Sequence, residues 1–509
     1  MNAPAILAES AARGRLSGAA SRKPVAIVDI GSNSVRLVIY ETFSRTPAVV
    51  HNEKSICAIG RNMVSSGQLN TDGIRMALDA LSRFRLLADA HGCEAREAVA
   101  TAAARDAANG ADFVRQAEKA WGGPIRILPG VEEAQLAAEG VIAGIPDADG
   151  LVADLGGGSL DMVGVKSGQT GTAMTLPFGP LRLMDQARGD AERARAMVQK
   201  ELRGLGAMGA LNGRSLYAVG GVWRSFARID MEETKYPLHV LQQYEIPRAR
   251  AIKLARVVAR MGKKQLERMK IVSRRRAEAL PYGAIVLEEL LLATGIKDVV
   301  VSAYGLREGL LHAQLPPAEK AKDPLIQFAA AANQRMSRAP RHAEELRRWL
   351  APLVDGADPF LARLLHAVSL FSDIGWRRHP DDRARGAFNQ TLTAPFAGAN
   401  HRMRALIATA IFHRYSGDED FPPEIAAAQN LLDPDDDRLA RVLGLGCRLA
   451  FALSASATGE LRNYDLGTAS GQLVLKVAPQ RARISGDPVP KRLNALAAAL
   501  GLEAKIESL

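Results

Sequence analysis

Two separate segments of the chain carry the same pattern of residues, and this repeat restricts the fold more than any other feature of the sequence. Residues 25–40 read VAIVDIGSNSVRLVIY, and residues 151–165 read LVADLGGGSLDMVGV. In each segment two apolar runs flank a short turn of glycine and polar residues, which is typical of a β-hairpin. The corresponding positions of the two copies are Asp29 and Asp154, Gly31 and Gly156, and Ser34 and Ser159. The repeat therefore predicts two similar half-domains.

The residue types in the two turns indicate phosphate chemistry. Glycine and serine leave backbone N–H groups uncovered in a tight turn, and such donors suit phosphate oxygens, as do hydroxyl groups. The acid that ends each first strand, Asp29 or Asp154, can hold a divalent cation beside the same phosphates, directly or through water. Gly-rich turns also close ordinary hairpins, but two such loops facing each other across a cleft would clamp one phosphate group.

A pair of glutamates follows a second turn. Residues 125–136, IRILPGVEEAQL, read as strand, turn and helix, so that Glu132 and Glu133 lie in the first helical turn. Carboxylates at this position can simply complement the helix dipole. Alternatively, one of the two is a general base that orients and deprotonates a water for attack on phosphorus.

The charge balance favours negatively charged partners without choosing among them. The 66 lysine and arginine residues outnumber the 55 aspartate and glutamate residues, which gives the 509-residue chain a formal net charge of +11. Nucleic acid, anionic membranes, nucleotides and inorganic phosphate chains would all be attracted. A basic balance is also common in proteins from arginine-rich proteomes, so charge alone assigns no partner.

Composition excludes several other classes of protein. Hydrophobic residues make up 47% and charged residues 24% of the chain, the usual mix of a folded soluble protein. Three widely spaced cysteines cannot form a disulfide framework or a four-thiolate zinc site, and they suit a reducing, cytoplasmic location. Apolar runs stay shorter than the roughly 20 residues that span a bilayer, so we expect neither a membrane segment nor a secretory signal.

Basic residues concentrate in residues 252–280, where apolar and basic positions alternate at helical spacing. The closely spaced basic positions are Lys263, Lys264, Arg268, Lys270, Arg274, Arg275 and Arg276. One interpretation is a solvated helix face. The other is an electrostatic path for a polyanion, whose binding would weaken as salt rises.

Six motifs occur in a characteristic order: DIGSNS at 29–34, ATAAARDA at 100–107, GVEEA at 130–134, DLGGGS at 154–159, GGV at 220–222 and SAYGLREG at 302–309. In this order they resemble the exopolyphosphatase and guanosine pentaphosphate phosphohydrolase (Ppx/GppA) family. The resemblance implies an α/β fold with a duplicated actin-like, ribonuclease-H-like (ASKHA) domain and an active site between its halves. It also implies Mg²⁺-assisted hydrolysis of terminal phosphate from inorganic polyphosphate or, as the close alternative, from guanosine pentaphosphate.

The resemblance also implies roles for individual residues. The catalytic glutamate of the family falls on Glu132, the first acid of its motif, with Glu133 as a neighbour in the helical turn. The phosphate-binding positions implied are Ser32, Asn33, Ser34, Arg105, Gly156, Gly157, Gly158, Ser159, Gly220 and Gly221. Arg36 lies on the same hairpin face as Ser34, so it either contributes to phosphate binding or is a solvated strand residue. The metal-associated positions are Asp29, Asp154 and Asp161.

Two positions depart from the family pattern. Many relatives carry glutamate where this chain has Asp161, which is shorter by one methylene and makes a metal or water contact there less certain. The third glycine-rich motif usually ends in threonine, and Val222 removes that hydroxyl. Gly220 and Gly221 then contribute only backbone groups or the turn itself.

The chain is predicted to divide into a flexible tail (1–23), two actin-like subdomains (24–145 and 146–315), a helical HD-like domain (316–436) and a small α+β domain (437–509). The HD-like resemblance rests on residues 364–376 with His366, His401 and His413. An HD metal site needs an adjacent His-Asp pair, and here the pair reads Ser372-Asp373. We therefore expect these histidines to be structural remnants or part of a polyanion-binding surface. Only the resemblance to the family implies a homodimer.

Two other classes of function stay open at this point. A kinase of the same superfamily would need an adenosine pocket and a sugar-binding aspartate, and the GVEEA motif argues against it. A non-catalytic polyphosphate or nucleotide sensor would use the basic surface and the degenerate HD-like domain. The acids Asp29, Glu132 and Asp154 argue against this third class. Neither a membrane nor a specific nucleic acid is expected as a partner.

Overall fold

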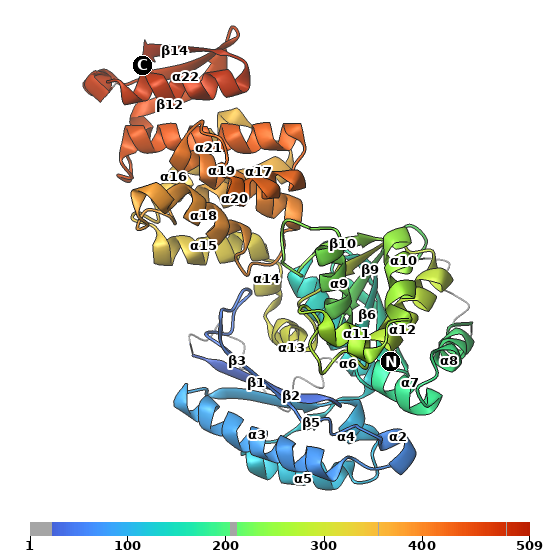
Figure 1. Ribbon diagram of the computed structural model, residues 1–509. Coiled ribbons are helices and arrows are strands. Elements are labelled where there is room, and N and C mark those ends of the chain that lie inside the picture. Colours follow the sequence, from blue (N-terminus) through green and yellow to red (C-terminus); the bar gives the residue numbers. More distant parts are fainter. Residues whose placement is uncertain (1–22, 204–210, 355, 485) are drawn as a thin grey trace. The chain divides into compact units, whose positions relative to one another are not determined.

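The computed structural model describes residues 23–203, 211–354, 356–484 and 486–509 (Figure 1). The chain divides into two compact units, one ending at Lys322 and the other beginning at Asp323. The tail predicted over residues 1–23 lies outside the described residues except for its last position. The predicted domain boundaries stay predictions.

The first sheet of the N-terminal unit has the strand order β3-β2-β1-β4-β5. Its strands are β1 (Val25–Ile30), β2 (Ser34–Tyr40), β3 (Val49–Ile56), β4 (Ala95–Ala100) and β5 (Arg126–Ile127). Its helices are α2 (Met63–Ser66), α3 (Thr71–Ala90), α4 (Ala102–Asp106) and α5 (Gly110–Trp121), followed by α6 (Gly130–Gly144). β1 pairs antiparallel with β2 and parallel with β4, so residues 25–40 form the predicted hairpin.

Both faces of β1 are buried, which explains its unbroken apolar run. Ala26, Val28 and Ile30 face a core that includes Phe84 of α3 and Trp121 of α5, and these two helices cover one side of the sheet (Figure 1). Alternate residues of β1 face a second core built with α6 and with helix α13 (Leu306–Gln314). Only Asp29, the residue before the last of the strand, interrupts the run, and it is partly exposed.

The second sheet repeats the first. Its order is β10-β11-β9-β6-β7-β8, and reading β8-β7-β6-β9-β11 reproduces β3-β2-β1-β4-β5. Its strands are β6 (Asp149–Leu155), β7 (Leu160–Lys166), β8 (Gln169–Leu176), β9 (Ser215–Val219), β10 (Tyr244–Pro247) and β11 (Asp298–Val301). Its helices are α7 (Pro180–Ala187), α8 (Ala191–Arg203), α9 (Gly221–Glu233), α10 (Arg248–Ala259), α11 (Lys263–Arg268) and α12 (Leu280–Thr294). The duplicated actin-like fold predicted from the sequence is confirmed.

Two helices cross closely where the repeats meet. A Cβ atom added to Gly309 of α13 would lie 1.8 Å from the Leu136 carbonyl oxygen of α6, and one added to Gly140 of α6 would lie 2.1 Å from the Gly305 carbonyl oxygen. Glycine at both positions therefore allows a contact that no other residue permits. The first turn of α6 contains Glu132 and Glu133, and the first turn of α13 contains Arg307. This crossing therefore sets the position of both helix starts.

The periodicity of the basic stretch 252–280 predicts a continuous helix, but the structure shows separate helices there. α10 ends at Ala259, α11 covers only Lys263–Arg268, and residues 269–279 form turns before α12. Gly262 separates the first two helices, and Pro281 lies in the first turn of α12. Proline is tolerated at a helix start but not inside a helix, so it forces a new helix to begin there.

The C-terminal unit is rich in helices and carries a small sheet of order β12-β13-β14. Its helices are α15 (Pro324–Met336), α16 (His342–Leu350), α17 (Pro359–Phe371), α18 (Arg383–Leu392), α19 (His401–Ser416), α20 (Pro423–Ala426), α21 (Pro434–Ser454) and α22 (Pro488–Leu500). Its strands are β12 (Tyr464–Ala469), β13 (Gln472–Val477) and β14 (Glu503–Ser508).

One hydrophobic core extends through the C-terminal unit, from Leu325 of α15 to Ala497 of α22. α21 runs across the predicted boundary between residues 436 and 437 and contributes to this core on its C-terminal side. α14 (Pro317–Lys320) ends the N-terminal unit. Across the described ranges of both units, no helix is long and apolar enough to cross a membrane.

Candidate active site

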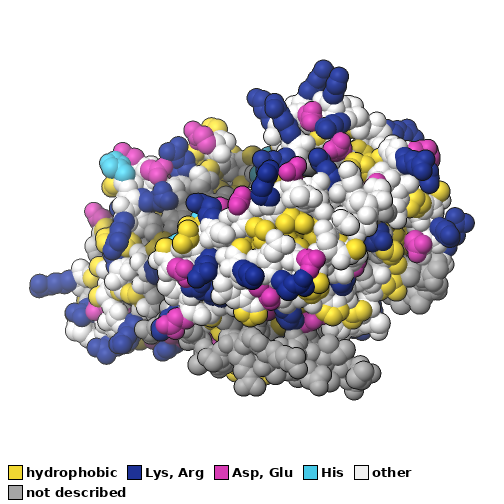
Figure 2. All heavy atoms as spheres, turned by 90° about the horizontal axis from the view of Figure 1, so that it is seen from below, with side chains coloured by type: hydrophobic (Ala, Val, Ile, Leu, Met, Phe, Trp, Pro, Cys, Tyr) yellow, Lys and Arg dark blue, Asp and Glu magenta, His cyan; other side chains and the backbone are white. Residues whose placement is uncertain are grey.

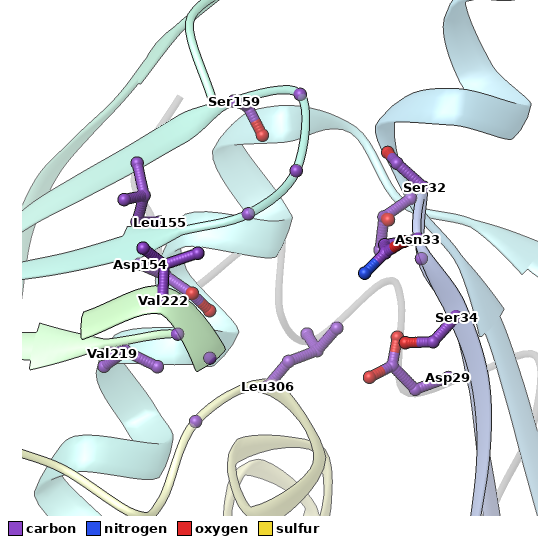
Figure 3. A pocket seen from close by; sticks show the side chains of 18 of the residues that line it. Asp29, Ser32, Asn33, Ser34, Asp154, Leu155, Ser159, Val219, Val222 and Leu306 are labelled. Carbon is purple, nitrogen blue, oxygen red and sulfur yellow. The ribbon is translucent and has the colours of Figure 1, made fainter. Parts of the chain in front are cut away.

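A pocket of about 220 Å³ lies between the turns of the two repeated hairpins. In Figure 3, Asp29, Ser32, Asn33 and Ser34 line one wall, and Asp154, Leu155, Ser159, Val219 and Val222 line the other. The three glycine-rich elements at the pocket are residues 31–34, 156–159 and 220–222. The structure therefore brings the predicted loops together around one space.

The two hairpin turns have matching backbone geometry. The Gly31 N–H donates to the Ser34 carbonyl at 3.0 Å, and the Gly156 N–H donates to the Ser159 carbonyl at 3.0 Å. Within the described chain, no acceptor is found for the backbone N–H groups of four pocket-lining residues: Ser32, Asn33, Gly157 and Gly158. Partly exposed N–H groups without a protein acceptor can donate to water or to an anion, and four of them at one pocket are a set of donors that suits phosphate oxygens.

The two loops approach each other closely because the second lacks side chains. A Cβ added to Gly157 would lie 3.4 Å from the Ser32 Cβ, and one added to Gly158 would lie 3.7 Å from the Ser32 Oγ. The third element is equally tight. Gly220 has a φ of 109°, and a Cβ there would lie 2.5 Å from the Leu155 carbonyl oxygen, so glycine is required by both conformation and space.

Asp29 and Asp154 face the pocket from opposite walls (Figure 3). The Arg307 Nη1 donates to the Asp29 Oδ2 at 2.9 Å. Burial and the nearby Asp161 raise the pKa of Asp154 to about 7. Carboxylate oxygens suit a hard cation such as Mg²⁺. No three acidic, histidine or cysteine side chains among the described residues are grouped to hold a metal, so a cation here would also need phosphate or water oxygens.

The structure places Glu133, and not Glu132, at the pocket. Successive helical residues point about 100° apart, so only one of the two glutamates can face the cleft. Burial and the carboxylates of Asp161 and Asp154 raise the pKa of Glu133 well above its ordinary value. The Arg105 Nη1 lies 3.4 Å from the Glu133 Oε2. Of the two glutamates, Glu133 is the one that lines the pocket, whereas the sequence analysis gave the catalytic role to Glu132.

Glu132 is buried beneath the first turn of α6, where it forms an ion pair with Arg126. Arg126 also donates to the Glu97 Oε1 of β4 at 3.0 Å. This network ties the helix start to the first sheet. The ion pair with Arg126 gives the buried Glu132 a partner on the sheet side, away from the pocket lining.

Two other predicted residues, Asp161 and Arg105, deviate from the expected arrangement, and Val222 lacks the usual hydroxyl as expected. Asp161 is buried behind the second loop and does not line the pocket; the Ser159 Oγ donates to its Oδ2 at 3.0 Å, and burial raises its pKa to about 6. Arg105 also lies outside the pocket lining but contacts Glu133 and donates to the Leu128 carbonyl at 2.9 Å. Val222 lines the pocket without a hydroxyl group.

Arg36 lines the pocket as predicted, and the Arg36 Nε donates to the Asn52 Oδ1 at 2.8 Å. Sequence reasoning missed several further cations that line it: Lys54, Arg224 and Arg307. It placed Arg275 and Arg276 on a solvated helix face or on a path for a polyanion, and the structure places both in the pocket lining. Arg307 lies inside the SAYGLREG motif, which was the available signal. No sequence motif indicated Lys54, because its place at the pocket depends on the pairing of β2 with β3.

Among the described residues of the C-terminal unit, the histidines are not grouped with acids in an arrangement that could hold a metal ion. Asp373 accepts bonds from Arg338 at 2.6 and 3.0 Å, and Arg414 lies 3.8 Å away. His413 Nδ1 lies 2.7 Å from the Gly417 carbonyl oxygen. In the described chain no metal-binding group surrounds Asp373. The HD-like resemblance stays a prediction, and guanidinium groups occupy the surroundings of its remaining aspartate.

Comparison with known proteins agrees with this geometry. The model of the Ppx/GppA phosphatase family matches residues 20–318, and that of the exopolyphosphatase C-terminal region matches residues 325–506. Exopolyphosphatase 2 of Mycobacterium tuberculosis is 25% identical over 309 residues, covering 56% of this chain and 97% of the relative. Retrograde regulation protein 2 of Saccharomyces cerevisiae is 26% identical over 443 residues, covering 78% and 73%.

Solved structures share the fold of the N-terminal unit. An exopolyphosphatase from Cytophaga hutchinsonii superposes with a TM-score of 0.53 at 21% identity, covering 57% of this chain and 97% of that one. A Ppx/GppA family member from Aquifex aeolicus has a TM-score of 0.50 at 23% identity, with coverage of 57% and 97%. At such identities the likeness concerns the fold alone.

Proposed function

The chain belongs to the Ppx/GppA phosphatase family, and from this premise we propose that it hydrolyses the terminal phosphoanhydride bond of inorganic polyphosphate. The observation that carries the proposal is the pair of matching loops, whose four unpaired N–H groups line one pocket beside Glu133. Such an arrangement can hold one terminal phosphate group and present a base to a water next to it.

The proposed reaction uses Glu133 as the general base. The carboxylate takes a proton from a water whose oxygen attacks the terminal phosphorus, and the bridging oxygen leaves with the shortened chain. The N–H groups of both loops bind the non-bridging oxygens, where negative charge has to be stabilised. Arg36, Arg224 and Arg307 offset the charge of the substrate from the pocket wall.

A divalent cation fits the same pocket. Asp29 and Asp154 are the residues that would hold Mg²⁺, which when bound supplies charge neutralisation at the phosphate oxygens. Asp161 supports the second loop from behind and is not proposed as a ligand, which changes the assignment made from the sequence.

The pocket lining favours polyphosphate over guanosine pentaphosphate. The lining residues that the structure describes include no aromatic side chain, and nucleic-acid bases are commonly bound by stacking on such side chains. The basic side chains of the pocket, in contrast, can bind any chain of phosphate groups. Guanosine pentaphosphate hydrolysis and a sensor without turnover are therefore the outcomes that a test must separate from the proposed activity.

The test is phosphate release by the full-length protein from long-chain polyphosphate and, in parallel, from guanosine pentaphosphate, each with Mg²⁺. We expect release from polyphosphate with the higher kcat/KM. Faster hydrolysis of guanosine pentaphosphate would assign the alternative activity. Salt-sensitive polyphosphate binding without release from either substrate would assign a sensor. A homodimer and a cytoplasmic location stay predictions, and light scattering of the purified protein tests the dimer.

A further inference from the structure

Each of the two hairpin turns accepts a backbone hydrogen bond from a segment outside its own hairpin. In the first turn the Gly60 N–H donates to the Ser32 carbonyl at 2.9 Å, and in the second the Leu181 N–H donates to the Gly157 carbonyl at 3.0 Å. Ser32 and Gly157 each follow the first glycine of their turn, so they are equivalent positions of the repeat. The same carbonyl is therefore held twice, although the donors come from different elements.

The two donors belong to segments of unlike structure. Residues 57–60 form a loop after β3, in which Ala58 has a φ of 50° that is uncommon for a residue with a side chain. Residues 179–182 contain the start of α7, where Pro180 has no N–H and Leu181 provides the first N–H of the helix. We call them the first and second supporting segments. Unlike segments that hold equivalent carbonyls favour a shared role for this bond.

A held carbonyl fixes the direction of the next N–H group along the chain. In a trans peptide the C=O of one residue and the N–H of the next point in opposite directions, and every described peptide bond is trans. The Asn33 N–H therefore points away from the first supporting segment, and the Gly158 N–H points away from the second. Both residues line the pocket, and neither N–H has an acceptor within the described chain. These two N–H groups are thus available to an anion in the pocket.

The close approach of each supporting segment depends on glycine. A Cβ added to Gly60 would lie 3.0 Å from the Ser32 Cβ and 3.3 Å from the Ser32 carbonyl oxygen. A Cβ added to Gly179 would lie 2.5 Å from the Gly157 carbonyl oxygen and 2.6 Å from the Gly158 nitrogen. Because φ is not positive at either glycine, the constraint is one of space and not of backbone conformation. Alanine at either position has to displace the supported turn, and more at Gly179 than at Gly60.

Directed N–H groups align a phosphate in a way that surface charge does not. Figure 2 shows described basic and acidic side chains interspersed on one face of the molecule. Donors whose direction is fixed in advance, in contrast, stabilise the charge that develops on the non-bridging oxygens. We propose that Gly60 and Gly179 are positioning residues, which keep the N–H groups of the two turns directed at the terminal phosphate. The inference rests on the proposed function and deepens it, because neither glycine itself lines the pocket.

The first test measures phosphate release from polyphosphate by full-length variants. Gly179→Ala should lower kcat about 100-fold, the cost of losing one directed donor, and Gly60→Ala, with its smaller displacement, about tenfold. KM should change less than about threefold, because these bonds strengthen in the transition state. A defect in folding alone would lower the amount of active protein and leave kcat per folded molecule unchanged.

Gly262→Ala is the matched control for an added methyl group. Gly262 has a φ of −73°, and a Cβ there would meet no atom within 4 Å, so kcat should stay within about twofold of the unsubstituted protein. Thermal unfolding identifies the variants that are folded, and Gly60→Ala decides the test if Gly179→Ala does not fold. Folded variants with the kcat of Gly262→Ala would overturn the proposal.

A second substitution tests the route through the first turn. Ser32→Gly removes the Cβ that would lie 3.0 Å from the one added to Gly60. Gly60→Ala should therefore lower kcat less than about threefold when it is introduced into Ser32→Gly protein, against about tenfold in the unsubstituted protein. An equal cost in both backgrounds would show that Gly60 does not act through Ser32, and it would overturn this assignment.

Binding of orthovanadate separates this inference from the proposed function, because it needs no turnover. Calorimetry with Mg²⁺ should show orthovanadate affinity falling in parallel with kcat, about tenfold in Gly60→Ala and about 100-fold in Gly179→Ala, and unchanged in Gly262→Ala. If the unsubstituted protein released no phosphate, the proposed function would fail, and these affinities would still decide the role of the two glycines. Equal affinities in all three variants, or no binding to the unsubstituted protein, would overturn it.

Discussion

The two hairpin copies have the same turn but different surroundings for their acids. Each turn closes with one backbone bond of 3.0 Å, and each places an aspartate at the pocket. Asp29 of the first copy accepts a bond from Arg307, whereas Asp154 of the second copy is opposite Asp161 in the strand register and has a pKa raised to about 7. The two copies thus share the backbone geometry of the turn, and the charges around it differ.

The largest expected difference between the copies concerns their aspartates. Asp29→Asn leaves the largely buried Arg307 without its carboxylate, so we expect the free energy of unfolding to fall by about 3 kcal/mol. Asp154→Asn removes a carboxylate whose charged form is disfavoured in the folded protein, so we expect no loss of stability at pH 7. Urea unfolding of both variants measures the contrast, and equal losses would contradict it.

The second prediction concerns pH. The folded pKa of Asp154 lies above its unfolded value, so the folded protein binds the proton more tightly and loses stability as pH rises through about 7. Between pH 5 and pH 8 the free energy of unfolding should fall by about 2 kcal/mol more in the unsubstituted protein than in Asp154→Asn. The same decline in both proteins would show that Asp154 does not titrate in this range.

The hydroxyl groups of the two loops give a smaller contrast. Ser159 donates to the buried Asp161, whereas the Ser34 hydroxyl has no partner among the described residues. We expect Ser159→Ala to lower the free energy of unfolding by about 1 kcal/mol and Ser34→Ala to change it by less than about 0.5 kcal/mol. Thermal unfolding without substrate tests this, and a larger loss in Ser34→Ala would reverse the assignment.

The smallest predicted effect tests the equivalence of the two turns. A Cβ added to Gly31 would lie 3.5 Å from the Ser34 carbonyl oxygen, and one added to Gly156 would lie 3.5 Å from the Ser159 carbonyl oxygen. Because φ is not positive at either glycine, both alanine variants should keep their stability within about 1 kcal/mol of the parent. A strongly unequal pair of unfolding midpoints would show that the turns are not equivalent.

Much of the fold could be predicted because it depends on local pattern. Apolar runs around Gly/Ser turns predicted both hairpins, and their repetition predicted the duplicated sheets. The stretch 252–280 was harder because its periodicity continues past Gly262, where the backbone ends one helix and starts another. A periodic pattern records which faces are apolar but not where one helix ends and another begins.

The site was predicted less completely, for a different physical reason. The loops could be identified from glycine and serine alone, but the choice between Glu132 and Glu133 depends on how α6 is rotated against β4 and β5. Arg126 and Glu97 hold Glu132 on the sheet side and thereby direct Glu133 to the pocket. Lys54 likewise reaches the pocket only through the register of β3, which no short motif encodes.

The most direct test of the account compares Glu133→Gln with Glu132→Gln in phosphate release from polyphosphate. The two variants make the same chemical change at adjacent residues of one helix, so each controls for the other. We expect Glu133→Gln to lower kcat by about 100-fold or more while polyphosphate binding is kept, and Glu132→Gln to lower it less than about tenfold. A folded Glu133→Gln protein with near-normal turnover, beside an inactive Glu132→Gln protein, would contradict the assignment of the base.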